Sequence, residues 1–178
     1  MTLVVILGGA RSGKSALALE LGRRWPGQVT FVATAEARDE DMRKRVERHR
    51  RERPSEWELV EEPRELGSLP VWRRDDLVVV DCLTLWVSNL LEAKRDQEAI
   101  AAQAEELAAV VVARRSPTVI VSNEVGLGVV PATPLGRQFR DLLGTVNGVF
   151  VARADNALFL VAGRALRLES IAVEEILA

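Results

Sequence analysis

The chain of 178 residues is long enough for one α/β domain with a full hydrophobic core. Its hydrophobic content of 48%, charged content of 28% and formal net charge of −2 describe an ordinary globular protein and exclude a globally basic nucleic-acid-binding protein. The single cysteine, Cys82, has no partner for an internal disulfide, which fits a reducing compartment. The N-terminal apolar segment follows no basic stretch and is too short to span a bilayer. We therefore expect a cytoplasmic protein without a membrane anchor or a nucleic-acid partner.

Short apolar runs rich in β-branched residues alternate with stretches of helix-forming residues. The runs predict strands at 3–7, 29–34, 77–81, 118–122 and 157–162, and an alternating pattern predicts an edge strand at 164–168. Helices are predicted at about 16–24, 39–52, 83–93, 96–115 and 135–152. Nearly continuous apolar strands are typical of parallel sheets covered on both faces. The alternation predicts one three-layer α/β domain spanning residues 1–178, with a mostly parallel sheet and helices on both faces.

A glycine-rich stretch follows the first predicted strand and leads into the first predicted helix. It matches the pattern G-x-x-x-x-G-K-[ST] with Gly8, Gly9, Ala10, Arg11, Ser12, Gly13, Lys14 and Ser15. The loop N–H groups and the helix N-terminus present positive charge to phosphate oxygens. Lys14 reaches the β- and γ-phosphates, and the Ser15 hydroxyl is a ligand for Mg²⁺. These flanking elements favour a nucleotide site of the P-loop NTPase type over a simple glycine-rich turn.

Asp81 ends the apolar run 77–81, and the carboxyl ends of parallel strands gather at one edge of the sheet. A carboxylate there is suited to hold Mg²⁺ beside the phosphate loop, directly or through water. The alternative is that Asp81 caps the following helix. We favour the metal, because the phosphate loop brings one to this edge.

The stretch 38–53 is strongly charged, with seven Lys or Arg residues between positions 43 and 53. Its apolar stripe is narrow and consists of Met42, Val46 and His49, at i, i+4 and i+7. One interpretation is a solvated charged helix. The other is a helix that meets a triphosphate and carries the only histidine of the chain. A neutral imidazole is a competent nucleophile toward phosphorus, and nearby Arg side chains stabilise charge on phosphoryl oxygens.

The stretch 122–131, which follows the fourth strand, contains two glycines and ends in a proline. This composition indicates a shaped loop at the ligand edge of the sheet. Glu124 in this loop has two interpretations. It has a functional role, as a base for a substrate hydroxyl or as a water-mediated metal partner, or it is part of a structural turn. Farther along, Arg137 and Arg140 suit either anion binding or solvation, and the sequence leaves both pairs of alternatives open.

From about residue 5 to residue 163, motifs in order resemble one known family. The family is the bifunctional adenosylcobinamide kinase / adenosylcobinamide-phosphate guanylyltransferase of cobalamin synthesis. The motifs that carry the resemblance lie at 8–15, 32–35, 45–50, 53–54, 57, 81–87, 89–91, 122–131, 140–141, 144, 147 and 154–155.

The resemblance implies two reactions. ATP or GTP phosphorylates the aminopropanol hydroxyl of adenosylcobinamide, and GMP from GTP then passes through a covalent guanylyl-histidine to adenosylcobinamide phosphate. The family's guanylylated histidine falls on His49. Its nucleotide contacts fall on residues 8–15 and on Ala33, Thr34, Ala35, Arg50, Arg51, Glu52, Arg53, Glu61 and Asp81.

The resemblance further implies a homotrimer. Mg²⁺ would be held by Ser15 and Asp81. Two alternatives to the bifunctional enzyme are a small-molecule kinase without nucleotidyl transfer and a regulatory nucleotide-binding switch.

Overall fold

The structure, a computed structural model, describes residues 2–172, with the side chain of Arg45 left out. Its strands form one seven-stranded sheet in the order β3-β2-β4-β5-β1-β6-β7. All neighbours are parallel except β6 and β7, which are antiparallel. The strands are β1 (Leu3–Gly8), β2 (Val29–Ala33), β3 (Glu58–Glu61), β4 (Leu77–Asp81), β5 (Thr118–Val121), β6 (Asn156–Val161) and β7 (Arg164–Leu168). The predicted mostly parallel sheet and its edge strand at 164–168 are confirmed.

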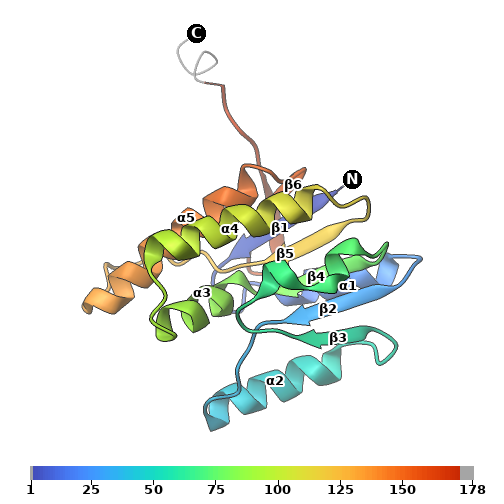
Figure 1. Ribbon diagram of the computed structural model, residues 1–178, viewed down its shortest axis with the longest axis horizontal. Coiled ribbons are helices and arrows are strands. Elements are labelled where there is room, and N and C mark those ends of the chain that lie inside the picture. Colours follow the sequence, from blue (N-terminus) through green and yellow to red (C-terminus); the bar gives the residue numbers. More distant parts are fainter. Residues whose placement is uncertain (1, 173–178) are drawn as a thin grey trace.

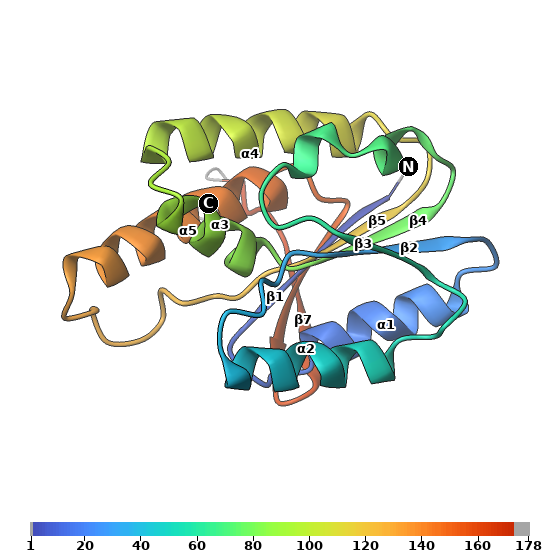
Figure 2. The same cartoon turned by 60° about the horizontal axis from the view of Figure 1, so that its bottom comes forward.

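Helices cover both faces of the sheet, which confirms the predicted three layers. Helices α1 and α2 lie on one face, and α3, α4 and α5 lie on the other (Figures 1 and 2). The helices are α1 (Lys14–Arg24), α2 (Glu40–Glu52), α3 (Leu83–Glu92), α4 (Gln97–Val112) and α5 (Pro134–Val151), with short 3-10 turns η1 (Leu66–Ser68) and η2 (Pro70–Arg73). Within the described part of the chain, no helix is both long enough and apolar enough to cross a membrane.

The core consists of two apolar clusters, one on each side of the sheet. Val5 and Leu7 of β1 face the larger cluster under α3, α4 and α5, whereas Ile6 faces the smaller cluster under α1. In β4, Val79 likewise points to the opposite side from its neighbours. Because both sides of these strands are buried, nearly all of their residues are apolar. The sequence therefore shows them as continuous apolar runs, the pattern from which they were predicted.

Two parts of the fold differ from the sequence prediction. The edge strand β3 was not expected, because its two apolar residues, Leu59 and Val60, are only half-buried and its flanking glutamates are exposed. Helix α4 ends at Val112 rather than near residue 115. Beyond it, Arg114 is buried and donates hydrogen bonds to the carbonyls of Val71 and Asp76, at 2.7 and 2.5 Å. Burial lowers the pKa of Arg114 below its ordinary value, while the two neighbouring aspartates oppose this shift.

Candidate active site

A cavity opens at the carboxyl edge of the sheet, beside the glycine-rich loop. Its lining comes from the loop, the first turn of α1, the ends of β4 and β5, and helix α2. The lining residues are Ala10, Arg11, Ser12, Gly13, Lys14, Ser15, Ala16, Arg48, His49, Asp81, Cys82, Val121 and Asn123. We call this space the phosphate cavity. It brings six of the eight predicted loop residues together with His49 and Asp81, which are distant in sequence.

Glycine is required at two turns of the loop. A Cβ on Gly8 would lie 2.4 Å from the carbonyl oxygen of Leu160, and Gly8 has φ +150°. Gly13 has φ +102° and is the N-cap of α1, where no side chain caps the helix. The first N–H groups of α1 therefore face the cavity, which is the arrangement that binds anions at helix N-termini.

Lys14 lies folded back over the loop. Only 7% of this residue is exposed, and its Nζ donates a hydrogen bond to the carbonyl of Gly9 at 2.7 Å. The ammonium group is thus held at the mouth of the loop, where the motif places the β- and γ-phosphates of a nucleotide.

Asp81 is half-buried beside this loop, with 10% of its side chain exposed. Its Oδ2 atom accepts no hydrogen bond from any described residue, although a buried carboxylate oxygen normally has a partner. The N-cap of α3 is Cys82, so the alternative of Asp81 as a helix cap is wrong. The peptide bond between Asp81 and Cys82 is cis.

The donor set fits a bound Mg²⁺. Asp81 has an unpartnered carboxylate oxygen, and the Ser15 side chain lines the same cavity. Among the described residues, no group of three or more His, Cys, Asp or Glu side chains is arranged to hold a metal ion. This pattern is typical of Mg²⁺ sites that take most of their oxygen ligands from substrate phosphates and water.

A second, more apolar cavity adjoins the first, between α2 and the ends of β2, β3 and β4. Its lining residues are Phe31, Ala33, Ala35, Met42, Val46, His49, Arg50, Arg53, Leu59, Glu61, Asp81, Cys82 and Leu85. We call it the base cavity. The guanidinium of Arg53 stacks over the Phe31 ring at 5.0 Å from its centroid. Burial lowers the pKa of Arg53, nearby Arg50 lowers it further and Glu61 opposes the shift. Apolar walls with a guanidinium and a carboxylate suit a planar heterocycle that carries hydrogen-bonding groups.

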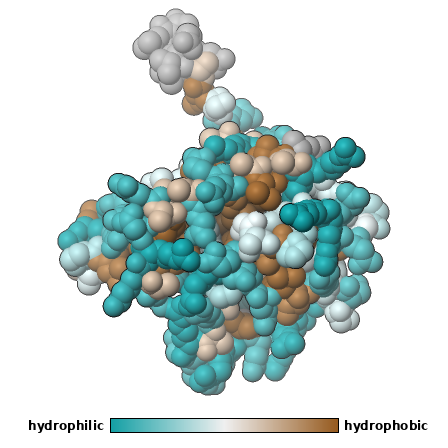
Figure 3. All heavy atoms as spheres, viewed as in Figure 1, coloured by the Kyte–Doolittle hydropathy of each residue, from teal (hydrophilic) through white to brown (hydrophobic). Residues whose placement is uncertain are grey.

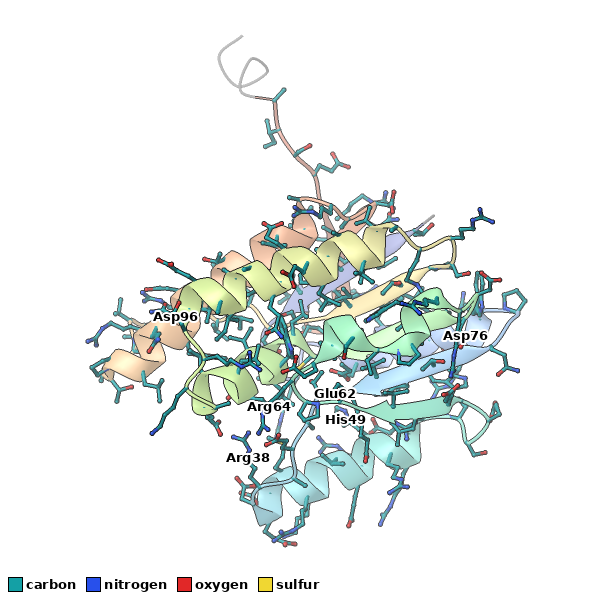
Figure 4. All side chains as sticks on the ribbon, in the orientation of Figure 1. Arg38, His49, Glu62, Arg64, Asp76 and Asp96 are labelled. Carbon is teal, nitrogen blue, oxygen red and sulfur yellow. The ribbon has the colours of Figure 1, made fainter. Side chains whose placement is uncertain are left out.

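His49 lies where the two cavities meet, and it lines both. Its Nδ1 is 3.7 Å from Asp81 Oδ2, which is too long for a hydrogen bond, and 30% of its side chain is exposed. Figure 4 shows the imidazole between α2 and the sheet edge. Met42 and Val46 line the base cavity with it, so the predicted narrow stripe of α2 faces the body of the protein. The outer surface of the protein around α2 is largely hydrophilic (Figure 3).

Thr34 stands between two cavity-lining residues but does not line either cavity itself. It is fully buried, and its hydroxyl donates to the Cys82 carbonyl at 2.7 Å and accepts from the Cys82 N–H at 2.8 Å. Ala33 and Ala35 on either side of it line the base cavity. Thr34 therefore holds the backbone next to Asp81 in place.

Four other predicted contacts also lie outside both cavities, namely Gly8, Gly9, Arg51 and Glu52. Arg51 is exposed and lies 3.8 Å from Glu47, and the backbone carbonyl of Glu52 accepts a hydrogen bond from Arg23 at 2.7 Å. Arg48, by contrast, lines the phosphate cavity and was not among the predicted contacts. Its only sequence signal is that it directly precedes His49 in the basic stretch.

The contacts of Glu124, Arg137 and Arg140 favour structural roles for all three side chains. The Glu124 carboxylate accepts a hydrogen bond from the Gly126 N–H at 2.5 Å, as in a structural turn. Arg137 donates to the carbonyls of Pro131 and Ala132, both at 2.9 Å, and so braces this loop. Arg140 pairs with Asp141 on the surface of α5.

The parallel sheet, the glycine loop and the helix that follows it define the chain as a P-loop protein of the NTPase-like fold. Comparison with known proteins narrows this class. The family model for cobinamide kinase / cobinamide phosphate guanyltransferase matches residues 4–168, and the chain belongs to that family.

Curated relatives agree with this assignment. The bifunctional adenosylcobalamin biosynthesis protein CobP of Pseudomonas aeruginosa is 38% identical over 167 residues, which cover 93% of this chain and 96% of that protein. The bifunctional adenosylcobalamin biosynthesis proteins CobU of Escherichia coli and Salmonella typhimurium are 33% and 34% identical. Each of these matches covers 94% of this chain and 99% of the relative.

Proposed function

We propose that this chain catalyses both reactions of its family on adenosylcobinamide. In the first reaction, ATP or GTP phosphorylates the aminopropanol hydroxyl. In the second, GMP is transferred from GTP to the new phosphate by way of a guanylyl group on His49. The observation that carries this proposal is the place of His49 at the junction of the phosphate and base cavities.

This junction explains how one loop serves an attack on the α-phosphorus. A nucleotide with its base in the base cavity and its β- and γ-phosphates on the loop passes the junction at its α-phosphate. Such a nucleotide would bring its α-phosphorus within reach of His49, and neither a regulatory switch nor a simple kinase needs a nucleophile at that position. We therefore favour the bifunctional enzyme over both alternatives.

The chain's own side chains supply the chemistry of guanylyl transfer. A nitrogen of the neutral His49 imidazole attacks the α-phosphorus, the bond from this phosphorus to the α,β-bridging oxygen breaks, and pyrophosphate leaves. An oxygen of adenosylcobinamide phosphate then attacks the same phosphorus, and the phosphorus–nitrogen bond breaks to release the imidazole. Lys14 and Arg48 stabilise the negative charge of the phosphoryl oxygens.

Ser15 and Asp81 are the residues that would hold Mg²⁺ in this site. When bound, this ion neutralises phosphate charge and orients the phosphoryl groups. The unpartnered Oδ2 of Asp81 supports this role.

We also propose a cytoplasmic homotrimer, on the strength of the family resemblance. Exposed apolar side chains support an assembly, because contacts between subunits bury such groups. Four of them lie in or just after the loop that follows β5, namely Leu127, Val129, Val130 and Leu135.

The test is a product assay with adenosylcobinamide, GTP and Mg²⁺, followed by mass spectrometry. We expect adenosylcobinamide phosphate to appear first, followed by adenosylcobinamide-GDP and pyrophosphate. Accumulation of the phosphate alone would indicate the kinase alternative, and no consumption of adenosylcobinamide would indicate the regulatory switch.

A further inference from the structure

Asn123 occupies a position between the two halves of the phosphate site. Strand β5 lies between β1, which leads into the glycine loop, and β4, which ends at Asp81. Val121 of β5 is in register with Ile6 on one side and with Asp81 on the other. Asn123 follows this strand by two residues and lines the phosphate cavity.

The backbone of Asn123 is fixed from three directions. Its N–H donates to the hydroxyl of Thr84 at 2.7 Å, and its carbonyl accepts from the Asn147 carboxamide at 3.0 Å. The next N–H, that of Glu124, donates to the Gly8 carbonyl at 3.1 Å. Thr84 and Asn147 are both buried, with 7% and 4% exposed. Helices α3 and α5 and strand β1 thus hold one residue at the cavity wall.

The side chain of Asn123 is left for a ligand. Its carboxamide makes no hydrogen bond within residues 2–172, although it lines a polar cavity. The Asn147 side chain donates its amide N–H to the Asn123 carbonyl. In this orientation its buried Oδ1 accepts no hydrogen bond from any described residue, which is unusual for a buried polar atom. Asn147 therefore positions the Asn123 backbone.

The neighbours of Asn123 show which end of a nucleotide it faces. The Glu124–Gly8 hydrogen bond places it beside the start of the loop, and Lys14 Nζ is bonded to Gly9 at that same start. Because the motif places Lys14 at the β- and γ-phosphates, Asn123 lies toward the terminal phosphate. Asn123 does not line the base cavity, where we place the opposite end of the nucleotide.

We propose that Asn123 binds the γ-phosphoryl group and stabilises it during the kinase step, with Thr84 and Asn147 as positioning residues. This inference rests on the proposed function for its substrate. The Asn123 Nδ2 donates to a γ-phosphoryl oxygen. The acceptor hydroxyl oxygen bonds to the γ-phosphorus, and the bond from this phosphorus to the β,γ-bridging oxygen breaks. The nucleoside diphosphate leaves, and the hydroxyl proton passes to a γ-phosphoryl oxygen and then to water.

The first test measures binding, so it does not depend on the corrinoid reaction. Titration calorimetry compares GDP and β,γ-imido-GTP, with Mg²⁺, on the wild-type chain and on Asn123→Ala. We expect the variant to lose about tenfold in affinity for the triphosphate analogue, with the affinity for GDP held within about twofold. Equal losses for the two nucleotides, or no loss for the analogue, would overturn the proposal.

The second test measures the two reactions separately. In Asn123→Ala we expect the rate of adenosylcobinamide phosphorylation to fall about 100-fold, whereas labelling of His49 by GTP falls by less than about tenfold. Gln97→Ala, which removes an exposed carboxamide at the start of α4, is the matched control. A kinase rate within about threefold of wild type would overturn the proposal. The two proposals can fail separately. If the wild-type chain does not phosphorylate adenosylcobinamide, but Asn123→Ala still loses affinity for the triphosphate analogue and not for GDP, the proposed function is refuted and Asn123 remains a γ-phosphate ligand.

The positioning role of Thr84 has its own readout. Thr84→Ser keeps the hydroxyl that holds Asn123, and Thr84→Val removes it. We expect Thr84→Ser to retain the preference for the triphosphate analogue over GDP, and Thr84→Val to lose it. We expect the two variants to have similar melting temperatures. Loss of the preference in both variants, or in neither, would contradict this role.

Discussion

The local chemistry of the site centres on Asp81. A buried carboxylate oxygen without a partner destabilises a fold unless a cation compensates it. His49 is 3.7 Å away, and neither this distance nor the fixed backbone around Cys82 satisfies the oxygen. We infer that Asp81 is kept for a ligand rather than for stability.

Asp81→Asn tests this inference, because it keeps the shape of the side chain and removes its charge. We expect both reactions to slow about 100-fold and the Mg²⁺ concentration for half-maximal rate to rise. The melting temperature is expected to stay the same or to increase, since no described residue loses a hydrogen bond to Oδ2. Thermal unfolding and Mg²⁺ titration check this, and a large decrease in melting temperature would indicate a structural role instead.

Two arginines of α2 make a matched pair. Arg48 lines the phosphate cavity, whereas Arg43 pairs with Glu40 on the solvent side at 3.0 Å. We expect Arg48→Ala to weaken GTP binding about tenfold, because a cation near the phosphates is lost, and Arg43→Ala to have little effect. Titration calorimetry with GTP is the measurement, and equal effects would show that only the net charge of α2 matters.

At the scale of the elements, helices α3 and α1 hold the two ends of α2, the helix that carries His49. Asn89 of α3 donates to the carbonyls of Thr34 and Pro63, at 2.8 and 3.1 Å, and accepts from Arg38 at 3.1 Å. Figure 4 shows Arg38 near the start of α2. At the other end, Arg23 of α1 binds the last turn of α2. These bonds tie the segment before α2 to α3 and the last turn of α2 to α1, although α2 has few apolar contacts of its own.

The turn between β6 and β7 supports the glycine loop in the same way. The Gly163 N–H donates to the Ser12 carbonyl at 2.9 Å, and a Cβ on Gly13 would lie 3.3 Å from the Gly163 Cα. Gly163 has φ +77°, a conformation that L side chains rarely adopt.

Gly163→Val is therefore expected to strain the turn and displace the loop. We predict a loss of about 1–2 kcal/mol in the free energy of unfolding and weaker GTP binding. Gly67→Ala is the control, since it has ordinary φ and open space around it. Urea unfolding and GTP titration check this, and a variant that loses stability without losing nucleotide affinity would show that the turn does not support the loop.

At the scale of the whole molecule, nucleotide binding is coupled to folding, because both cavities are built from segments that are distant in the chain. A ligand at 100 times its dissociation constant stabilises the folded state by about 2.7 kcal/mol. We expect GTP with Mg²⁺ to raise the melting temperature of the wild-type chain and to raise that of Lys14→Met much less. Differential scanning fluorimetry measures both shifts, and equal shifts would place the nucleotide away from the loop.

Much of this architecture was predictable from the sequence, because strands buried on both faces and a P-loop between strand and helix leave strong local patterns. The rest depends on tertiary pairing. Strand β3 has only two half-buried apolar residues and exists because it pairs with β2. No local pattern reveals that Thr34 turns inward, or that Asn123 is held by helices from two other parts of the chain.

The site shows the same division. The loop, His49 and Asp81 each stand out by residue type or by place at a strand end, so the sequence alone was enough to select them. Which residues of the basic stretch line the phosphate cavity depends on how α2 lies on the sheet, so the sequence could not separate Arg48, which lines it, from Arg51, which is exposed.

The central claim is that His49 carries the guanylyl group, and covalent labelling tests it most directly. The chain is incubated with α-³²P-labelled GTP and Mg²⁺, then denatured and separated from free nucleotide. We predict a label that survives alkali, is released by acid and is absent from His49→Ala. No label on the wild-type chain under conditions of turnover, or an equal label on His49→Ala, would contradict the account.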